Sequence, residues 1–237
     1  MSEVILKKDG RIVVRGTEIV TQDEYEVDLN PALLATLGRG ILLKIKDAAQ
    51  LPLGSVGVCV LGDGTVYLSI RLPQLKLKTA ATIDGEKAWP VFSSAGTAIE
   101  FLWVPPDDCA VIYLAQMVPT SPGWACKQPY LFAQDLTKPA DFYHLPLANL
   151  YSDCRLCTGL DRPTAGSNAL DCLAAALNHL EASRWNSHLI GDNGDVDNAK
   201  AVFQFKVVKD GFETLTNPKW KSYSRKVGTT LLEYIAL

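Results

Sequence analysis

The sequence predicts an α+β protein, because strand-like segments fill most of the chain and helical periodicity follows them. In the first third, short apolar or alternating runs typical of strands occur at 12–15, 41–45, 56–61 and 65–70. The last two runs flank Gly62, Asp63 and Gly64, which suit a tight reversal, so we expect a β-hairpin there. A short helix is expected over residues 31–37, with Asn30 as its N-cap.

A second set of strand-like segments lies in the middle of the chain, at 87–92, 98–104, 109–117 and 128–133. Turns containing Gly or Pro separate these segments, a pattern that favours an antiparallel β-meander. We therefore divide the chain at about residue 85, into a β-rich N-terminal extension over 1–84 and a core with C-terminal helices over 85–237.

Two helices are expected after the strands. Leucines recur at helical spacing behind Asn168, a possible N-cap, at Leu170, Leu173, Leu177 and Leu180. The same period near the C-terminus predicts an amphipathic helix that carries Trp220, Tyr223, Val227, Leu231 and Tyr234.

The composition excludes several classes of protein. The 237 residues include 23 Lys+Arg and 26 Asp+Glu, and this balance lacks the basic surplus of a nucleic-acid-binding protein. The first residues mix charges with apolar side chains, unlike a secretory signal, and Pro and Gly interrupt the uncharged stretch 109–126, so no membrane span is expected. We expect a cytoplasmic protein whose six cysteines are reduced thiols.

The most informative segment is L-A-N-L-Y-S-D-C-R-L-C over 147–157, where Asn149 lies eight residues before Cys157. It resembles the N-V-Y-x-x-G-x-V-C segment around the active site of ubiquitin-conjugating enzymes. It is more similar still to bacterial ubiquitin-conjugating-like proteins, the PRTRC system protein B family and its relatives in antiphage ubiquitin-like operons. The resemblance extends over about 86–237, through F-L-W-V-P-P at 101–106, R-W-N-S-H-L with His188, and S-R-K-V-G-T-T-L-L at 224–232.

This resemblance implies a ubiquitin-conjugating-enzyme-like fold and a thioester transferase. Cys157 would accept the C-terminal acyl group of a ubiquitin-like modifier from an adenylating activating enzyme and pass it to an amine on a target protein. Asn149 would stabilise the oxyanion, and His188 would act as general base or support the loop. The family also implies a JAB-type deconjugating peptidase in the pathway, with ATP used by the activating enzyme and no cofactor or metal on this chain.

The segment departs from the family pattern at two places. Eukaryotic members carry His-Pro where this chain has Leu147 and Ala148, and the usual glycine three residues before the nucleophile is Cys154. These departures keep open a non-catalytic scaffold of the same fold. The Cys154 and Cys157 pair also has the spacing of half a zinc site or of a redox C-x-x-C. No second close pair of cysteines completes a zinc site, and no helical run follows the pair as in thioredoxin-like redox sites.

Some neighbouring residues have interpretations of their own. Tyr151 is expected to be a packing residue. The acidic loop 192–197 is either a solvated turn or an attractor for an incoming lysine. The basic residues of the last predicted helix form either a solvated face or a partner site, and they are Lys219, Lys221, Arg225 and Lys226.

Overall fold

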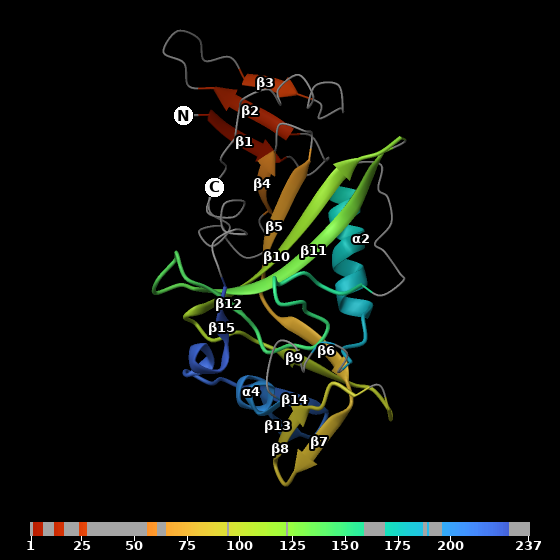
Figure 1. Ribbon diagram of the computed structural model, residues 1–237, viewed down its shortest axis with the longest axis vertical. Helices are drawn as coiled ribbons and strands as arrows, with labels where there is room; N and C mark the ends of the chain where they lie inside the picture. The colour runs from red at the N-terminus through yellow and green to blue at the C-terminus, as the bar shows by residue number, and fades with distance from the viewer. Residues whose placement is uncertain are drawn as a thin grey trace.

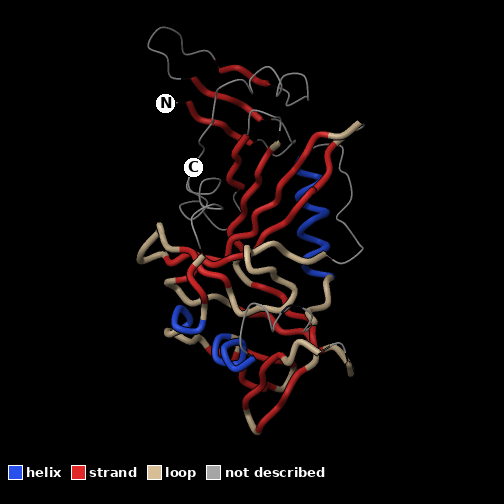
Figure 2. Tube along the Cα trace, viewed as in Figure 1, coloured by secondary structure: helices blue, strands red, loops and turns tan. Residues whose placement is uncertain are grey.

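The computed structural model describes an α+β molecule with four antiparallel sheets and two α-helices (Figure 1; Figure 2). It describes residues 65–93, 95–121, 123–158, 169–186, 189 and 196–227, together with strands nearer the N-terminus. The predicted α+β class is therefore confirmed. The strand predicted at 41–45, the helix at 31–37 and the acidic loop up to residue 195 lie outside the described residues.

The largest sheet has six strands in the order β15-β12-β11-β10-β5-β4. Its members are β4 (Val56–Val60), β5 (Val66–Leu72), β10 (Cys109–Pro119), β11 (Trp124–Asp135), β12 (Phe142–His144) and β15 (Arg225–Lys226). The two strands of the predicted hairpin, β4 and β5, pair antiparallel, with Val60 opposite Val66, and the predicted turn residues 62–64 lie outside the described residues.

The predicted meander of four consecutive strands is wrong in its membership. Only β10 and β11 are neighbours, while β9 (Ile99–Trp103) pairs with β6 (Leu75–Thr79), and β8 (Lys87–Pro90) pairs with β7 (Ala81–Asp84) and β13 (Gln204–Val208). The reason is burial: β10 is buried along most of its length and takes a central place, whereas β9 alternates and suits a half-covered sheet.

The helix α2 (Ala169–Ala182) confirms the prediction from the leucine spacing. It packs against β11 and β10, with Leu173 and Leu180 buried in the main core (Figure 1). Beneath it, the hydroxyl of Tyr113 in β10 donates a hydrogen bond to the Ala176 carbonyl over 3.3 Å. One turn of the helix is thus tied to the centre of the sheet.

Strand pairs join residues on the two sides of the division predicted near residue 85. The turn between β7 and β8 contains residue 85, and β5 pairs with β10 along the central sheet. Completing the fold are α4 (Val196–Val202), β14 (Gly211–Leu215) beside β13, and a sheet of β1 (Ser2–Leu6), β2 (Ile12–Gly16) and β3 (Glu24–Val27).

The predicted C-terminal helix is wrong over its first half. Residues Trp220–Tyr223 form a 3-10 turn, η3, and the chain is extended again at Ser224 before β15. Side-chain contacts fix this turn, because the indole of buried Trp220 donates to Asp108 over 2.9 Å. Residues 228–237 lie outside the described part. Strands β13 and β14 also follow the helices, so the expected order of strands first and helices last is not kept.

Within the described residues, each helix is too short or too polar to span a membrane.

Candidate functional site

Cys157 lies at the end of a small β-hairpin, residues 149–157, which we call the Cys157 hairpin. Its two arms are joined by hydrogen bonds from Cys157 N to Asn149 O over 2.7 Å and from Tyr151 N to Arg155 O over 2.9 Å. The returning arm also pairs with β11, through Leu131 N to Cys154 O at 3.0 Å. The hairpin therefore extends the same edge of β11 that β12 occupies further along.

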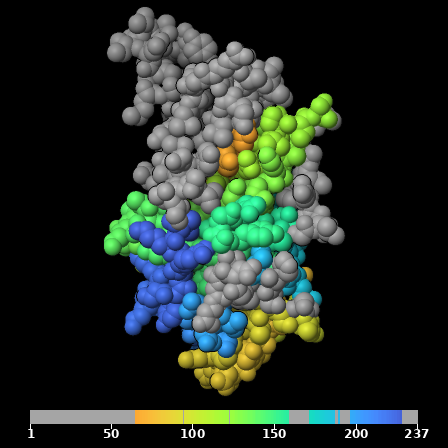
Figure 3. All heavy atoms as spheres, in the orientation of Figure 1, coloured from red at the N-terminus to blue at the C-terminus, as the bar shows by residue number. Residues whose placement is uncertain are grey.

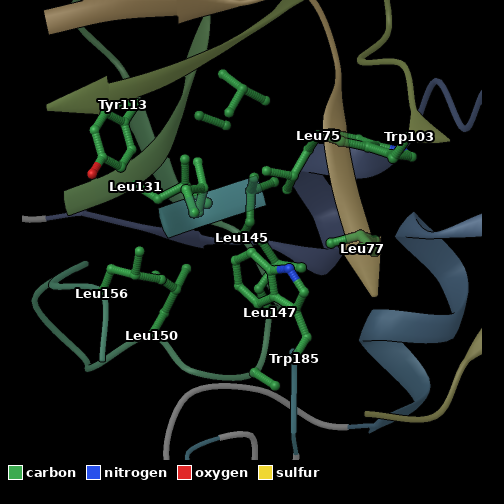
Figure 4. Close-up of a cluster of buried hydrophobic side chains, with 14 of the residues drawn as sticks. Leu75, Leu77, Trp103, Tyr113, Leu131, Leu145, Leu147, Leu150, Leu156 and Trp185 are labelled. Carbon is green, nitrogen blue, oxygen red and sulfur yellow. The ribbon is translucent and has the colours of Figure 1, made fainter. Parts of the chain in front are cut away.

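The two faces of this hairpin differ, because side chains alternate along each arm. Leu150 and Leu156 lie opposite each other and are buried, and Figure 4 shows them pointing toward the core that includes Leu131. At the next position along each arm, Asn149 and Cys157 are joined by their backbone hydrogen bond. Because Cys157 follows the buried Leu156, alternation places its sulfur on the face opposite the leucine pair.

The turn of the hairpin needs a backbone that favours glycine. Cys154 has φ 67°, in the left-handed region, at the position where the resembled family has glycine. Its side chain is fully buried, and burial raises the pKa of its thiol to about 12. Cys154 is therefore a packing residue of the turn.

Cys157 differs from the other described cysteines by its exposure. It is partly exposed and free, whereas Cys109, Cys126, Cys154 and Cys172 are buried. Burial also raises the pKa of Cys126 to about 12 and that of Cys109 further. Because the thiolate is the reactive form of cysteine, these buried thiols are poor nucleophiles.

A tyrosine hydroxyl lies beside the sulfur. Tyr151, which is 36% exposed, donates from its hydroxyl to Cys157 Sγ over 3.7 Å, and this hydrogen bond, with the sulfur's charge, raises the pKa of Tyr151. Arg155 covers the tyrosine ring at 5.0 Å and binds Asp153 over 2.6 Å. The expectation that Tyr151 is a packing residue is wrong, since its side chain is exposed and its hydroxyl contacts the sulfur.

Asn149 links the hairpin to the segment after α2. Its Nδ2 donates to Arg184 O over 3.0 Å, and its Oδ1 accepts from Asn186 N over 3.3 Å. The segment itself is anchored by buried Trp185, whose backbone N and indole Nε1 donate to the carbonyls of Lys78 and Lys76. Asn149 also has φ 59°, a conformation that asparagine tolerates better than most residues.

Two further residues hold the hairpin turn, and sequence analysis missed both. His144 Nε2 donates to Tyr151 O over 2.9 Å, and Arg225 donates to Ser152 O over 2.6 Å. In Figure 3 the C-terminal segment, in blue, lies beside the residues around 150, in blue-green, in keeping with the Arg225 contact. The available signal was a single histidine inside the otherwise apolar run 142–148.

The structure thus brings together Asn149 and Cys157, and His188 lies outside the described residues. Within the described ranges no group of three or more His, Cys, Asp or Glu side chains has the arrangement of a metal site. The helix expected to carry the four basic residues is not formed over 220–226, and three of the four residues bond to the chain itself. The pairs are Lys221 with Asp108 and Asp135, Lys226 with Asp141, and Arg225 with the Ser152 carbonyl.

Comparisons with protein-family models, curated protein sequences and solved structures found no match to this chain.

Proposed function

We propose that this chain is a ubiquitin-conjugating-like transferase that carries a ubiquitin-like modifier as a thioester on Cys157. The supporting observation is the arrangement around the sulfur: Cys157 is partly exposed on the polar face of the hairpin, beside Tyr151 and opposite Asn149. The thiols of Cys109, Cys126, Cys154 and Cys172 are buried. The ubiquitin-conjugating-like fold, a cytoplasmic location and a bacterial antiphage or plasmid system belong to the same proposal, on the resemblance of the motifs.

In the first step, the Cys157 thiolate attacks the thioester carbonyl that joins the modifier's C-terminus to a cysteine of the activating enzyme. A new carbon–sulfur bond to Cys157 forms, the old one breaks, and the activating enzyme leaves as a thiolate that takes up a proton. Exposure of the sulfur is the main requirement, since an ordinary thiol is ionised to a few per cent at neutral pH.

In the second step, a target amine attacks the carbonyl carbon held on Cys157. The carbon–nitrogen bond forms, the carbon–sulfur bond breaks, and the amine gives up a proton, which we assign to His188 as general base. The negative charge on the carbonyl oxygen needs a donor, and such a donor contributes about 3–4 kcal/mol in hydrolases. Asn149 Nδ2 carries two hydrogens, of which the bond to Arg184 O uses one.

A non-catalytic scaffold of the same fold is the second candidate. It is favoured by one observation: both polar atoms of the Asn149 side chain are engaged with the backbone at Arg184 and Asn186. An asparagine that serves only to hold the loop needs no reacting group nearby. In that case Cys157 would not carry a modifier.

Reconstitution with the activating enzyme, modifier and ATP of its system separates the two candidates. The transferase predicts a gel-shifted adduct that reducing agent removes and that Cys157→Ser lacks under the same conditions, although serine can trap a thiol-resistant ester. Cys126→Ala removes a buried thiol and is the matched control, which keeps the adduct. An adduct that is absent from the wild type, or that survives unchanged in Cys157→Ser, contradicts the proposal.

A further inference from the structure

The turn of the Cys157 hairpin is held by a pair of side chains from two other strands. His144 on β12 and Arg225 on β15 are opposite each other in the antiparallel register. They donate to carbonyls that are adjacent in the chain, those of Tyr151 and Ser152, over 2.9 and 2.6 Å. The cross-strand pair of His144 and Arg225 therefore binds two successive carbonyls of the turn.

The histidine is built into the protein for this contact. Its side chain is 1% exposed, and because its partner is a carbonyl, Nε2 must carry the proton. The other ring nitrogen, Nδ1, is buried without a hydrogen-bond partner among the described residues. Burying an unpaired nitrogen is unfavourable, so the bond from Nε2 to the Tyr151 carbonyl is the polar contact that favours an imidazole over an apolar side chain at this position.

One of these two carbonyls belongs to the residue that contacts the sulfur. Tyr151 carries both the carbonyl that accepts from His144 and the hydroxyl that donates to Cys157 Sγ over 3.7 Å. A shift of its backbone would move the hydroxyl away from the sulfur. A displacement of about 1 Å at a reacting group can lower a rate by as much as a hundredfold.

We propose that His144 and Arg225 are positioning residues for transfer at Cys157, acting by fixing the Tyr151 backbone so that its hydroxyl stays on the sulfur. This inference rests on the proposed function. Its geometric part concerns the sulfur's surroundings and is testable without the modifier. Arg225 is the charged side chain that faces His144 from β15, and its charge joins burial in keeping the imidazole neutral.

The test measures the rate at which iodoacetamide alkylates Cys157, resolved by mass spectrometry of the peptide. We expect His144→Ala and Tyr151→Phe each to slow alkylation by about twofold, with the double variant no slower than either, because both remove the same contact. His144→Gln, which keeps a side-chain N–H donor, restores the wild-type rate. Arg225→Ala slows the reaction similarly, and Arg225→Lys restores it.

Thermal unfolding of each variant confirms that the rates are those of folded protein. Multiplying effects, with the double variant about fourfold slower, or a His144→Gln variant as slow as His144→Ala, overturn the inference. The same variants then enter the reconstituted transfer assay. If wild-type protein forms no modifier adduct while the alkylation pattern holds, the proposed function fails and the positioning of the sulfur stands.

Discussion

Replacing Asn149 by alanine should destabilise the fold, because this side chain joins the Cys157 hairpin to the segment after α2. The substitution removes two hydrogen bonds, to Arg184 O and Asn186 N. Each bond contributes about 0.5–1.5 kcal/mol net. Asn149 is also only 8% exposed and has φ 59°, and alanine in the left-handed region costs roughly 1 kcal/mol more than asparagine. Together these effects predict a loss of about 2–4 kcal/mol.

Urea unfolding followed by tryptophan fluorescence measures this loss, since Trp185 is buried in the segment that Asn149 contacts. Asn149→Gly is the matched control, because it loses the same hydrogen bonds but has no left-handed penalty. Its gain is offset by the roughly 0.5–1 kcal/mol of extra chain entropy that glycine loses on folding. We therefore expect the free energies of unfolding of the two variants to agree within about 1 kcal/mol.

An Asn149→Ala variant within about 0.5 kcal/mol of the wild type would refute this reasoning, since it would mean that the side chain makes neither bond in solution. The result also bears on catalysis. An asparagine that acts only on the oxyanion leaves stability unchanged on removal, whereas the contacts described here predict loss of both stability and transfer.

Three further predictions follow from other contacts. Tyr151→Phe should slow alkylation of Cys157 by about 1.5- to 2.5-fold. The variant loses an exposed hydrogen bond to the thiolate, about 0.5–1 kcal/mol, and a more nucleophilic sulfur offsets part of this loss. A rate equal to or faster than that of the wild type contradicts the prediction. Burial lowers the pKa of His144 below 6.5, so the free energy of unfolding should fall as pH drops below 6.5, by at most about 1.4 kcal/mol per pH unit; an equal fall in His144→Gln in urea titrations contradicts it. Burial opposes ionisation of Asp135, but hydrogen bonds, led by the one from Lys221, lower its pKa below 3.8. The stability that the ionised carboxylate contributes is therefore present above pH 3.8 and is lost as the pH falls through the lowered pKa. Asp135→Asn should be less stable than the wild type at pH 6 and should lose less free energy of unfolding between pH 4 and pH 2.

Local patterns predicted the elements whose burial is local in origin. The helix α2 follows from leucines three and four positions apart, and its Leu173 and Leu180 are buried against the sheet. The strand β10 follows from the uncharged run, and its burial on both faces leaves no alternation to read. The pairing of β9 with β6 could not be predicted from local patterns, because the pairing of strands distant along the chain depends on the burial of whole sheet faces.

The prediction of a C-terminal helix was wrong for a different reason. The spacing of Trp220, Tyr223 and Val227 does have a helical period, but a distant contact fixes the first of them, through the indole bond to Asp108. The ion pairs of Lys221 with Asp108 and Asp135 hold the 3-10 turn against the ends of β10 and β11. Helical periodicity in a short segment therefore competes with tertiary contacts that the sequence does not reveal.

At the candidate site, the hairpin closes between Asn149 and Cys157, so their backbones are joined by a hydrogen bond. The roles that the resemblance implies for Asn149, Cys157 and His188 stay predictions. The contact from Tyr151 to the sulfur depends on the alternation of side chains in an unpredicted hairpin. The grip of His144 on the turn depends on the pairing of β12 with β15, which lie about 80 residues apart.

The most direct test of the central claim is the mass of the peptide that contains Cys157 after incubation with the activating enzyme, modifier and ATP. The account predicts that this peptide gains the modifier's C-terminal residues through a bond that thiols cleave, and that Cys157→Ala protein gains nothing. Attachment at another cysteine, or no attachment while the activating enzyme itself is charged, would contradict it.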